Sequence, residues 1–314
     1  MAYLLSSGHQ QIFAGAGSVT RAQFFIGVDG GATRCRGRAR DAAGAELAQD
    51  AGPAANIYVD FEAGLNVIRG VVDSVIAKGR LGARRRSEMA LGVGLAGLSS
   101  ASEAARVAAA LPGWMRVEVV NDAVTACVGA NGASDGGLII AGTGTAGIAR
   151  VGGVARIVGG RGFLLGDDGS GARIGADALR AALRACDGLA PMTGLSRGLL
   201  SEFGDDPLRM TKWAQTAKPG DYGAFAPKVF EAARAVDPEA LAIVDRAAQA
   251  IVALVKTVEA LGAERIALVG GVAAPLRPHL PAEIAARLHE PKYDAVDGAI
   301  LLVGGTLAAP GELA

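Results

Sequence analysis

The chain has 314 residues, and its 31 basic and 31 acidic side chains cancel, which gives a sequence pI of about 6.8. A nucleic-acid partner is not expected, because binding to a phosphate backbone depends on a surplus of Lys and Arg. Hydrophobic residues make up 51% and charged residues 20%, the composition of a folded rather than a disordered protein. This length predicts two domains.

Cysteine usage and the first residues predict a cytoplasmic protein. Cys35, Cys127 and Cys186 are too few and too scattered for a disulfide framework, a CxxC metal site or a redox pair. The N-terminus has no basic start and no uninterrupted apolar stretch, so no signal peptide is predicted, and no later segment reads as a membrane span. Residues 1–23 show no periodicity and are expected to form a loose extension outside the fold.

The first half of the chain alternates predicted strands and helices. Strands are expected at 24–28, 34–39, 45–49, 89–94 and 116–120. Helices are expected at 61–77 with Asp60 as N-cap, at 101–111 with a capping box of Ser100 and Glu103, and from Asp122 to Ala130.

The second half begins with a similar pattern and then becomes mainly helical. Strands are expected at 138–140, 145–151, 154–158 and 266–269, and helices at 172–186, 225–235, 238–261 and from about 297 to 307. Segment 28–33 resembles segment 140–145, which suggests two copies of one unit, with a boundary near 133–136. The alternation predicts an α/β architecture with mixed sheets.

Glycine turns that directly follow strands are the candidate phosphate sites. In the first, Asp29, Gly30, Gly31 and Thr33 offer backbone N–H groups, a hydroxyl and a carboxylate that could hold Mg²⁺ through water. A plain hairpin turn is the alternative. The other two turns consist of Gly142, Thr143, Gly144 and Thr145, and of Gly270 and Gly271. Three such turns after three strands favour a nucleotide ligand over three simple connections.

Asp122 is the candidate catalytic base. It follows a predicted strand and opens a helix, so its carboxylate is expected at the sheet edge where ligand sites of α/β proteins gather. In phosphoryl transfer to an alcohol, such a base accelerates the reaction by about 10²- to 10⁴-fold. The alternative is that Asp122 or Asn121 simply caps the helix.

The densest glycine cluster lies at 159–171 and contains Asp167 and Asp168 just before a predicted helix. Ordering such a loop is costly, which favours a ligand-binding role. The alternative is a flexible connector in which Asp168 or Ser170 is the N-cap.

Six motifs in this order resemble the N-acetylglucosamine kinase and BadF/BcrA-type ATPase family of the actin, Hsp70 and sugar-kinase superfamily. They are DGGATR at 29–34, GLAGL at 94–98, ND at 121–122, AGTGT at 141–145, GGRGFLLGDDGSGARIG at 159–175 and LVGG at 268–271. The resemblance implies two ribonuclease-H-like (actin-like ATPase) domains with mixed sheets around a nucleotide cleft. The domains would be 24–134, completed by a C-terminal helix at about 297–309, and 135–296.

The resemblance also implies roles for individual residues, with ATP and Mg²⁺ as cofactors and an aminosugar as substrate. Thr33 and Thr143 to Thr145 would face the phosphates, and Gly270 and Gly271 the adenosine. Asp122 would be the base that acts on the sugar 6-hydroxyl. The sugar-binding residues would be Asn56, Gly160, Arg161, Gly162 and Asp167.

The implied activity is N-acetyl-D-glucosamine kinase, with glucosamine kinase as the nearest alternative. Arg161 replaces the tryptophan usual in the family, which leaves the choice of aminosugar open, and Asp168 replaces the usual glutamate. A second alternative is a nucleotide-switched activator of the BadF/BcrA type, but the cysteines needed for its iron–sulfur cluster are missing. Zinc-containing ROK-type proteins look less similar. A homodimer is a candidate assembly, because relatives commonly dimerise.

Overall fold

The computed structural model describes residues 22–308 except 32–33, 56, 58–59 and 83. Contacts divide the chain into two compact units. Unit 1 draws its residues from Met1–Gly136, Ile148–Arg156 and Pro291–Ala314, and unit 2 from Gly137–Gly147 and Ile157–Glu290. Among the described residues, none of the helices combines the length and the apolar character that a bilayer crossing requires.

The first sheet has five strands in the order β3-β2-β1-β4-β5. Strands β1 and β2, and β2 and β3, pair antiparallel, whereas β1–β4 and β4–β5 are parallel. The strands are β1 (Phe24–Gly30), β2 (Cys35–Asp41), β3 (Glu46–Gly52), β4 (Met89–Leu95) and β5 (Arg116–Asn121). The associated helices are α1 (Phe61–Lys78), the 3₁₀ turn η1 (Arg86–Glu88), α2 (Ala101–Ala109), α3 (Asp122–Asn131) and α12 (Ala295–Leu302).

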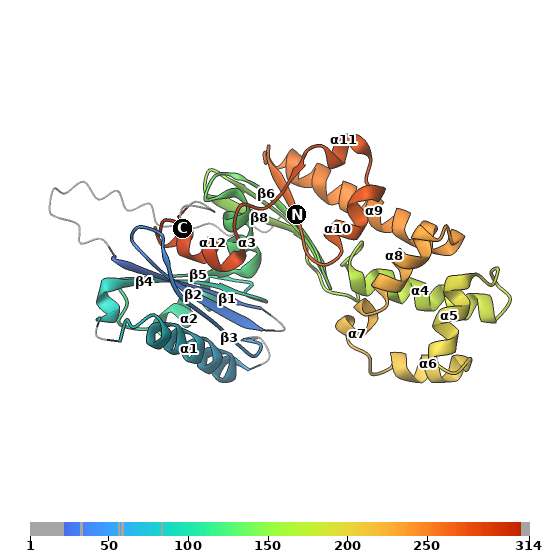
Figure 1. Cartoon of the computed structure of the whole chain (residues 1–314), viewed down its shortest axis with the longest axis horizontal. Coiled ribbons are helices and arrows are strands. Elements are labelled where there is room, and N and C mark those ends of the chain that lie inside the picture. The colour runs from blue at the N-terminus through green and yellow to red at the C-terminus, as the bar shows by residue number, and fades with distance from the viewer. Residues whose placement is uncertain (1–21, 32–33, 56, 58–59, 83, 309–314) are drawn as a thin grey trace. The chain divides into compact units, whose positions relative to one another are not determined.

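Helices cover both faces of this sheet, with α1 and α2 on one face and α12 and α3 on the other (Figure 1). On the α1 face, Ile26 and Val28 of β1 are fully buried in the main core of the unit. On the other face, Gly27 and Gly92 are register partners on β1 and β4, and a Cβ on either would overlap the backbone of α12. Glycine at these positions therefore lets α12 pack directly on the sheet backbone.

The second sheet has five strands in the order β10-β9-β6-β7-β8. They are β6 (Gly136–Ala141), β7 (Thr145–Val151), β8 (Val154–Gly159), β9 (Ile266–Val269) and β10 (Leu288–His289). Read from the other edge, the order is 8-7-6-9-10, which is the order 3-2-1-4-5 of the first sheet with each number raised by five. The repeat suggested by the sequence is thus present in the strand order.

Helices make up most of the remaining chain, and α9 is the longest of them in the described part. Its N-cap is Asp237, whose side chain accepts hydrogen bonds from the backbone N–H groups of Glu239 and Ala240. The helical elements are α4 (Gly171–Cys186), α5 (Gly194–Glu202), α6 (Pro207–Ala214), α7 (Pro219–Gly223), α8 (Ala226–Arg234), α9 (Pro238–Ala260), α10 (Ala273–Leu276), η2 (Arg277–His279) and α11 (Ala282–Ala285).

The predicted end of the last helix is wrong. The sequence predicts a helix from about 297 to 309, whereas α12 begins at Ala295 and ends at Leu302. Gly304 has φ +88°, and the N–H of Gly305 donates to the carbonyl of Ile300, so the chain closes the helix in a left-handed turn. The predicted caps of α1 and α2 are confirmed, including the capping box of Ser100 and Glu103.

Candidate functional site

Two carboxylates lie at the same edge of the first sheet. Asp29 is near the end of β1 and Asp122 directly follows β5, and the parallel strand β4 lies between them. The carboxyl ends of parallel strands meet at one edge of a sheet, so the fold brings these two side chains together from distant positions in the sequence. This agrees with the expected location of the base.

The pKa of the Asp122 carboxyl is raised to about 6. Burial is the main cause, the charge of Asp29 adds to it, and a hydrogen bond from the N–H of Ala123, at 2.9 Å, acts in the opposite direction. Asn121 is the N-cap of α3, with its side-chain oxygen 3.0 Å from the same N–H. Asp122 itself is partly buried and is not the cap, and a carboxyl group with a pKa raised in this way is a candidate for acid–base chemistry.

Asp29 is bound by a neighbouring arginine. Its Oδ2 accepts hydrogen bonds from Nη2 and Nε of Arg36 at 2.6 and 3.2 Å, and its side chain is 15% exposed. Arg36 also lies 3.7 Å from Asp294, the N-cap of α12. The Asp29 carboxylate is therefore held in a fixed position with its charge partly compensated.

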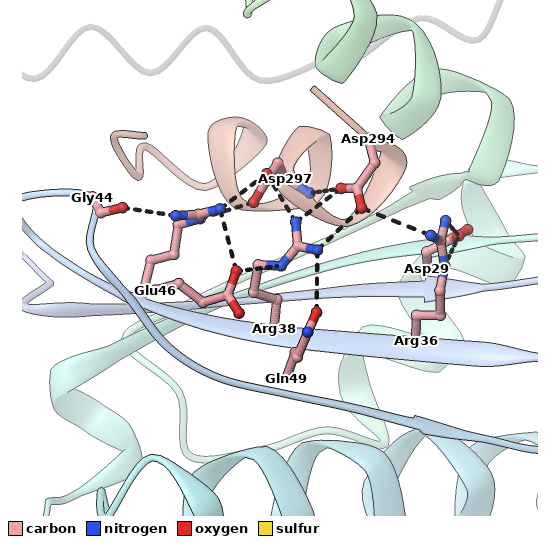
Figure 2. Close-up of polar contacts among 9 residues, drawn as sticks. Asp29, Arg36, Arg38, Gly44, Glu46, Gln49, Asp294 and Asp297 are labelled. Carbon is pink, nitrogen blue, oxygen red and sulfur yellow. Dashed lines mark hydrogen bonds and ion pairs between the residues drawn. The ribbon is translucent and has the colours of Figure 1, made fainter. Parts of the chain in front are cut away.

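The Asp29–Arg36 pair is one end of a larger ion-pair network (Figure 2). Arg36, Arg38 and Arg40 alternate along β2, so their side chains share the face of the sheet that α12 covers. Asp297 accepts from Arg40 at 2.9 Å and lies 2.8 Å from Arg38, and its side chain is only 7% exposed. The network fastens α12 to β2.

The donor set at this edge suits Mg²⁺ bound mainly through phosphate. In such sites the protein supplies one or two carboxylates and the ion keeps several waters. Asp29 supplies one such carboxylate, and its side chain is 15% exposed at this edge of the sheet. Asp29 would hold the ion, as the sequence predicts.

In unit 2, the predicted phosphate turn lies between β6 and β7 and is fixed by backbone hydrogen bonds. Gly142 O accepts from Gly171 N at the start of α4, at 2.8 Å, and Thr143 O accepts from Ala172 N at 3.3 Å. The turn therefore lies against the N-terminus of a 16-residue helix. The first N–H groups of α4 are thus taken up by the turn itself and by the cap Ser170, so they fix the turn in place and are not free donors for an anion.

Asp167 lies beside this turn. Its Oδ1 accepts from the N–H of Thr145 at 3.3 Å, and its carboxylate lies next to Gly144. The Oγ1 of Thr145 is buried and has no hydrogen-bond partner among the described residues. The structure thus brings a residue predicted for the sugar into contact with residues predicted for the phosphates.

The loop at 159–171 is held by an arginine that the sequence analysis did not single out. Arg173 donates from Nη2 to the carbonyls of Phe163 and Gly166 at 2.9 and 3.1 Å. Gly160 N donates to Thr145 O at 3.0 Å, which joins the loop to β7, and Ser170 is the N-cap of α4. The loop is an ordered element rather than a flexible connector.

The turn after β9 meets the turn after β6, because these strands are parallel neighbours. Gly270 has φ +107°, and a Cβ there would overlap the carbonyl of Ala141. Val272 N donates to the same carbonyl at 2.9 Å. Position 270 therefore requires glycine, and the close contact holds Gly271 near the β6–β7 turn.

A cavity of about 640 Å³ opens beside these turns, entirely within unit 2. We call it the glycine-lined cavity. Among the predicted nucleotide residues, it is lined by Gly142, Thr143 and Gly271. The lining residues that sequence analysis missed come from α4, α7, α8 and the start of α10, and they are Gly171, Gly220, Gly223, Ala226, Pro227, Phe230, Arg234, Val272 and Pro275. The glycines of PGDYG, at 219–223, were the available sequence signal.

The remaining predicted residues are placed as follows. Gly30 and Gly31 form the end of β1 and the start of its turn, where Gly30 O accepts from Ala96 N at 2.9 Å. Gly162 and Arg161 belong to the loop held by Arg173. Thr33 and Asn56 lie outside the described residues.

The chain is similar to known and solved proteins that are named as aminosugar kinases. Glucosamine kinase GspK of Vibrio cholerae is 32% identical over 281 residues, which cover 90% of this chain and 96% of the relative. N-acetyl-D-glucosamine kinase of Dictyostelium discoideum is 33% identical over 264 residues, 75% of this chain and 79% of the relative. A solved structure from Chromobacterium violaceum, provisionally named an N-acetylglucosamine kinase, shares 32% identity and a TM-score of 0.81, and the match covers 90% of this chain and 99% of that one.

The fold class expected from the sequence, actin-like with two mixed sheets, is confirmed by this structural match and by the two five-stranded sheets. The family model for BadF/BadG/BcrA/BcrD ATPases matches residues 26–303, which span both units. The chain therefore belongs to the BadF/BadG/BcrA/BcrD ATPase family.

Proposed function

We propose that this protein transfers the γ-phosphoryl group of ATP to the 6-hydroxyl of N-acetyl-D-glucosamine. That the chain is a sugar kinase follows from its relatives, two of which are kinases of glucosamine and of N-acetyl-D-glucosamine at 32 and 33% identity. The identity of the aminosugar and the position of the phosphorylated hydroxyl are what we propose beyond the sugar-kinase activity. A cytoplasmic setting and a homodimer remain predictions from the sequence.

The observation that carries the proposal is the raised pKa of Asp122, about 6, at the carboxyl edge of the first sheet. A carboxylate of this basicity is still ionised at neutral pH, yet it accepts a proton more readily than an ordinary aspartate. Asp122 would take the hydroxyl proton of the sugar as the oxygen attacks phosphorus. A slow ATPase whose acceptor is water has less need of a base tuned in this way.

The backbone of unit 2 would bind the nucleotide. The glycine-lined cavity is large enough for a small ligand, and Gly142, Thr143 and the start of α4 meet at its edge. Backbone N–H groups and the Thr143 hydroxyl would hold the phosphates there. Mg²⁺, held at Asp29, would supply positive charge that offsets the charge developing on the transferred group.

The sugar would be bound by Asn56, Gly160, Arg161, Gly162 and Asp167 together with Asp122. Asp167 lies beside Thr145, so a sugar bound to Asp167 would also lie near the phosphate turn. That proximity is what direct transfer between two bound substrates requires. Glucosamine is the second candidate substrate, because the Vibrio cholerae relative, matched over 96% of its length, is a glucosamine kinase.

The cysteines argue against the activator alternative. Cys35 and Cys127 are both buried, and burial raises the pKa of their thiols to about 12 and about 11, whereas a cluster held between two subunits needs cysteines at the surface. Cys186 is exposed on α4. The described residues hold no His, Cys, Asp and Glu group of three or more that could bind a metal.

The test is ADP release from MgATP in the presence of N-acetylglucosamine, glucosamine, glucose, N-acetylmannosamine or no sugar. We expect strong stimulation by N-acetylglucosamine and a 6-phosphate product in the proton-coupled phosphorus NMR spectrum. Preferential stimulation by glucosamine would establish the alternative substrate. ADP release that is indifferent to all sugars would contradict the kinase proposal and favour an ATP-driven activator.

A further inference from the structure

The glycine-lined cavity offers few polar side chains to a nucleotide. Of the described residues that line it, only Thr143 and Arg234 have polar side chains that could form a hydrogen bond with a ligand. The others are glycines, prolines and apolar residues, and Pro227 and Pro275 also lack a backbone N–H. Recognition of a base by side-chain hydrogen bonds would therefore depend on very few groups.

Of the two polar side chains, Thr143 lies in the β6–β7 turn near the N-terminus of α8, and Arg234 is the last residue of α8. The N-terminus of α8 is next to the phosphate turn, because a Cβ on Gly171 would lie 3.8 Å from that of Ala226, and Gly171 N donates to Gly142 O. Arg234 comes eight residues after Ala226 on the same helix, which is about 12 Å farther at 1.5 Å per residue. If the phosphates lie at Thr143, the base lies toward Arg234.

Arg234 is available for a ligand. It is exposed, and within the described part of the chain its guanidinium forms no ion pair or hydrogen bond. Phe230 precedes it by one helical turn, lines the same cavity and is 4% exposed, so it forms a fixed apolar wall beside the guanidinium. A planar cation next to an apolar wall suits the face or the edge of a flat base.

The guanidinium group of Arg234 does not favour adenine over guanine. Arginine only donates hydrogen bonds, and guanine presents two acceptors, N7 and O6, to such a fork, whereas adenine presents one acceptor beside an amino donor. Stacking of a guanidinium on a base works with any base. We propose that the nucleotide site accepts guanine nucleotides as well as adenine nucleotides, and that Arg234 is the residue that contacts the base. This inference rests on the proposed binding of the nucleotide in this cavity.

The first test is calorimetric binding of MgADP and MgGDP to the full-length protein, with GTP offered as phosphoryl donor in the same buffer. We expect a Kd for GDP within tenfold of that for ADP, and sugar phosphorylation with GTP. A Kd for GDP more than tenfold weaker than that for ADP would overturn the inference and leave the kinase proposal intact. If neither nucleotide binds, the placement of the nucleotide fails, and the inference fails with it.

The second test assigns the effect to Arg234. Arg234→Gln should weaken GDP binding by about tenfold, the lower range for loss of a two-point contact to guanine, and should weaken ADP binding less. Arg234→Lys keeps a positive charge at the C-terminal end of α8 but loses the fork, so it should also weaken GDP binding. GDP affinity that stays at the wild-type value in both variants would remove Arg234 from the base site.

Arg246→Gln is the matched control. Arg246 is an exposed arginine on α9 that lies outside the cavity lining and forms no ion pair within the described residues. Its substitution should leave both Kd values unchanged. Thermal unfolding of each variant shows whether the protein is folded, so a loss of binding by a folded Arg234→Gln protein is attributable to the contact itself.

Discussion

The two candidate regions differ in the groups that they present to a ligand. The edge of the first sheet presents charged side chains: Asp29 is fixed by Arg36, and Asp122 has a carboxyl group that burial makes more basic. In unit 2, the cavity is lined by glycine backbone together with apolar side chains, and its shape depends on turns such as that at Gly270. Substitutions should therefore change the reaction rate in the first region and ligand binding or folding in the second.

Asp122→Asn should have the largest effect on catalysis. We expect kcat to fall by about 10²- to 10⁴-fold, the usual contribution of a general base, with sugar binding retained. Steady-state assays that determine kcat and the KM for the sugar separately measure the two effects. Undiminished turnover would show that another group accepts the proton.

The same variant should be more stable than the wild type. The pKa of Asp122 is raised in the folded protein, so its carboxylate lowers stability above pH 6, and the penalty disappears as the pH falls below the unfolded value near 3.8. A shift of this size corresponds to at most about 3 kcal/mol. Thermal unfolding at pH 7.5 should show a higher Tm for the variant, and at pH 4 the difference should shrink. A lower Tm at pH 7.5 would indicate a structural role.

Asp297→Ala should have the largest effect on folding among the ion pairs. It leaves Arg38 and Arg40 without their buried partner beneath α12, and breaking a buried pair costs about 3 to 5 kcal/mol. Urea unfolding measures the decrease in the free energy of unfolding. The control is Asp73→Ala, whose exposed pair with Arg86 should contribute less than about 1 kcal/mol. An equal decrease in unfolding free energy in the two variants would contradict the stabilising role of the ion-pair network beneath α12.

Adjacent glycines give a sharper comparison within unit 2. Gly270→Ala should destabilise the protein by about 1 to 3 kcal/mol, because alanine is strained at positive φ and its Cβ would overlap the carbonyl of Ala141. Gly271→Ala meets no atom within 4 Å, so it should fold normally and only narrow the cavity. Paired urea unfolding and ADP titrations separate the two effects. A stable Gly270→Ala protein would refute the requirement for glycine.

The pH dependence of kcat/KM should be the smallest of these effects near neutrality. Asp122 must be ionised to accept a proton, so kcat/KM, which reports the free enzyme, should fall as the pH drops through about 6 and then by about tenfold per unit. The residual activity of Asp122→Asn should lack this step. A wild-type profile that is flat down to pH 5 would mean that the base has an ordinary pKa or does not limit the rate.

Local signals were readable in the sequence because they act between near neighbours. Asp60 and Ser100 with Glu103 are N-caps as expected, and the glycine turns follow the predicted strands. The position of Asp122 at the sheet edge followed from its place directly after a predicted strand. The roles that the family resemblance implies for individual site residues stay predictions.

Features that depend on distant residues could not be read in this way. The partners Arg40 and Asp297 are 257 positions apart, and no local pattern links them. Phe230 and Arg234 belong to the cavity only because α8 packs near the phosphate turn, which is a property of the tertiary fold. The end of α12 was missed because apolar residues continue to Val303, whereas the left-handed turn at Gly304 decides where the helix stops.

The contact of α12 with Gly27 and Gly92 has a consequence for synthesis of the protein. The helix that covers the first strand is the last one in the described chain, so the ribosome must translate almost the whole sequence before Ala295–Leu302 emerges. Until then one face of the nascent sheet is without its cover, and Phe25 and Ala90 lack contact with Ile300. The unit that begins first is thus completed last, and chains released early would expose this apolar face to chaperones or to one another.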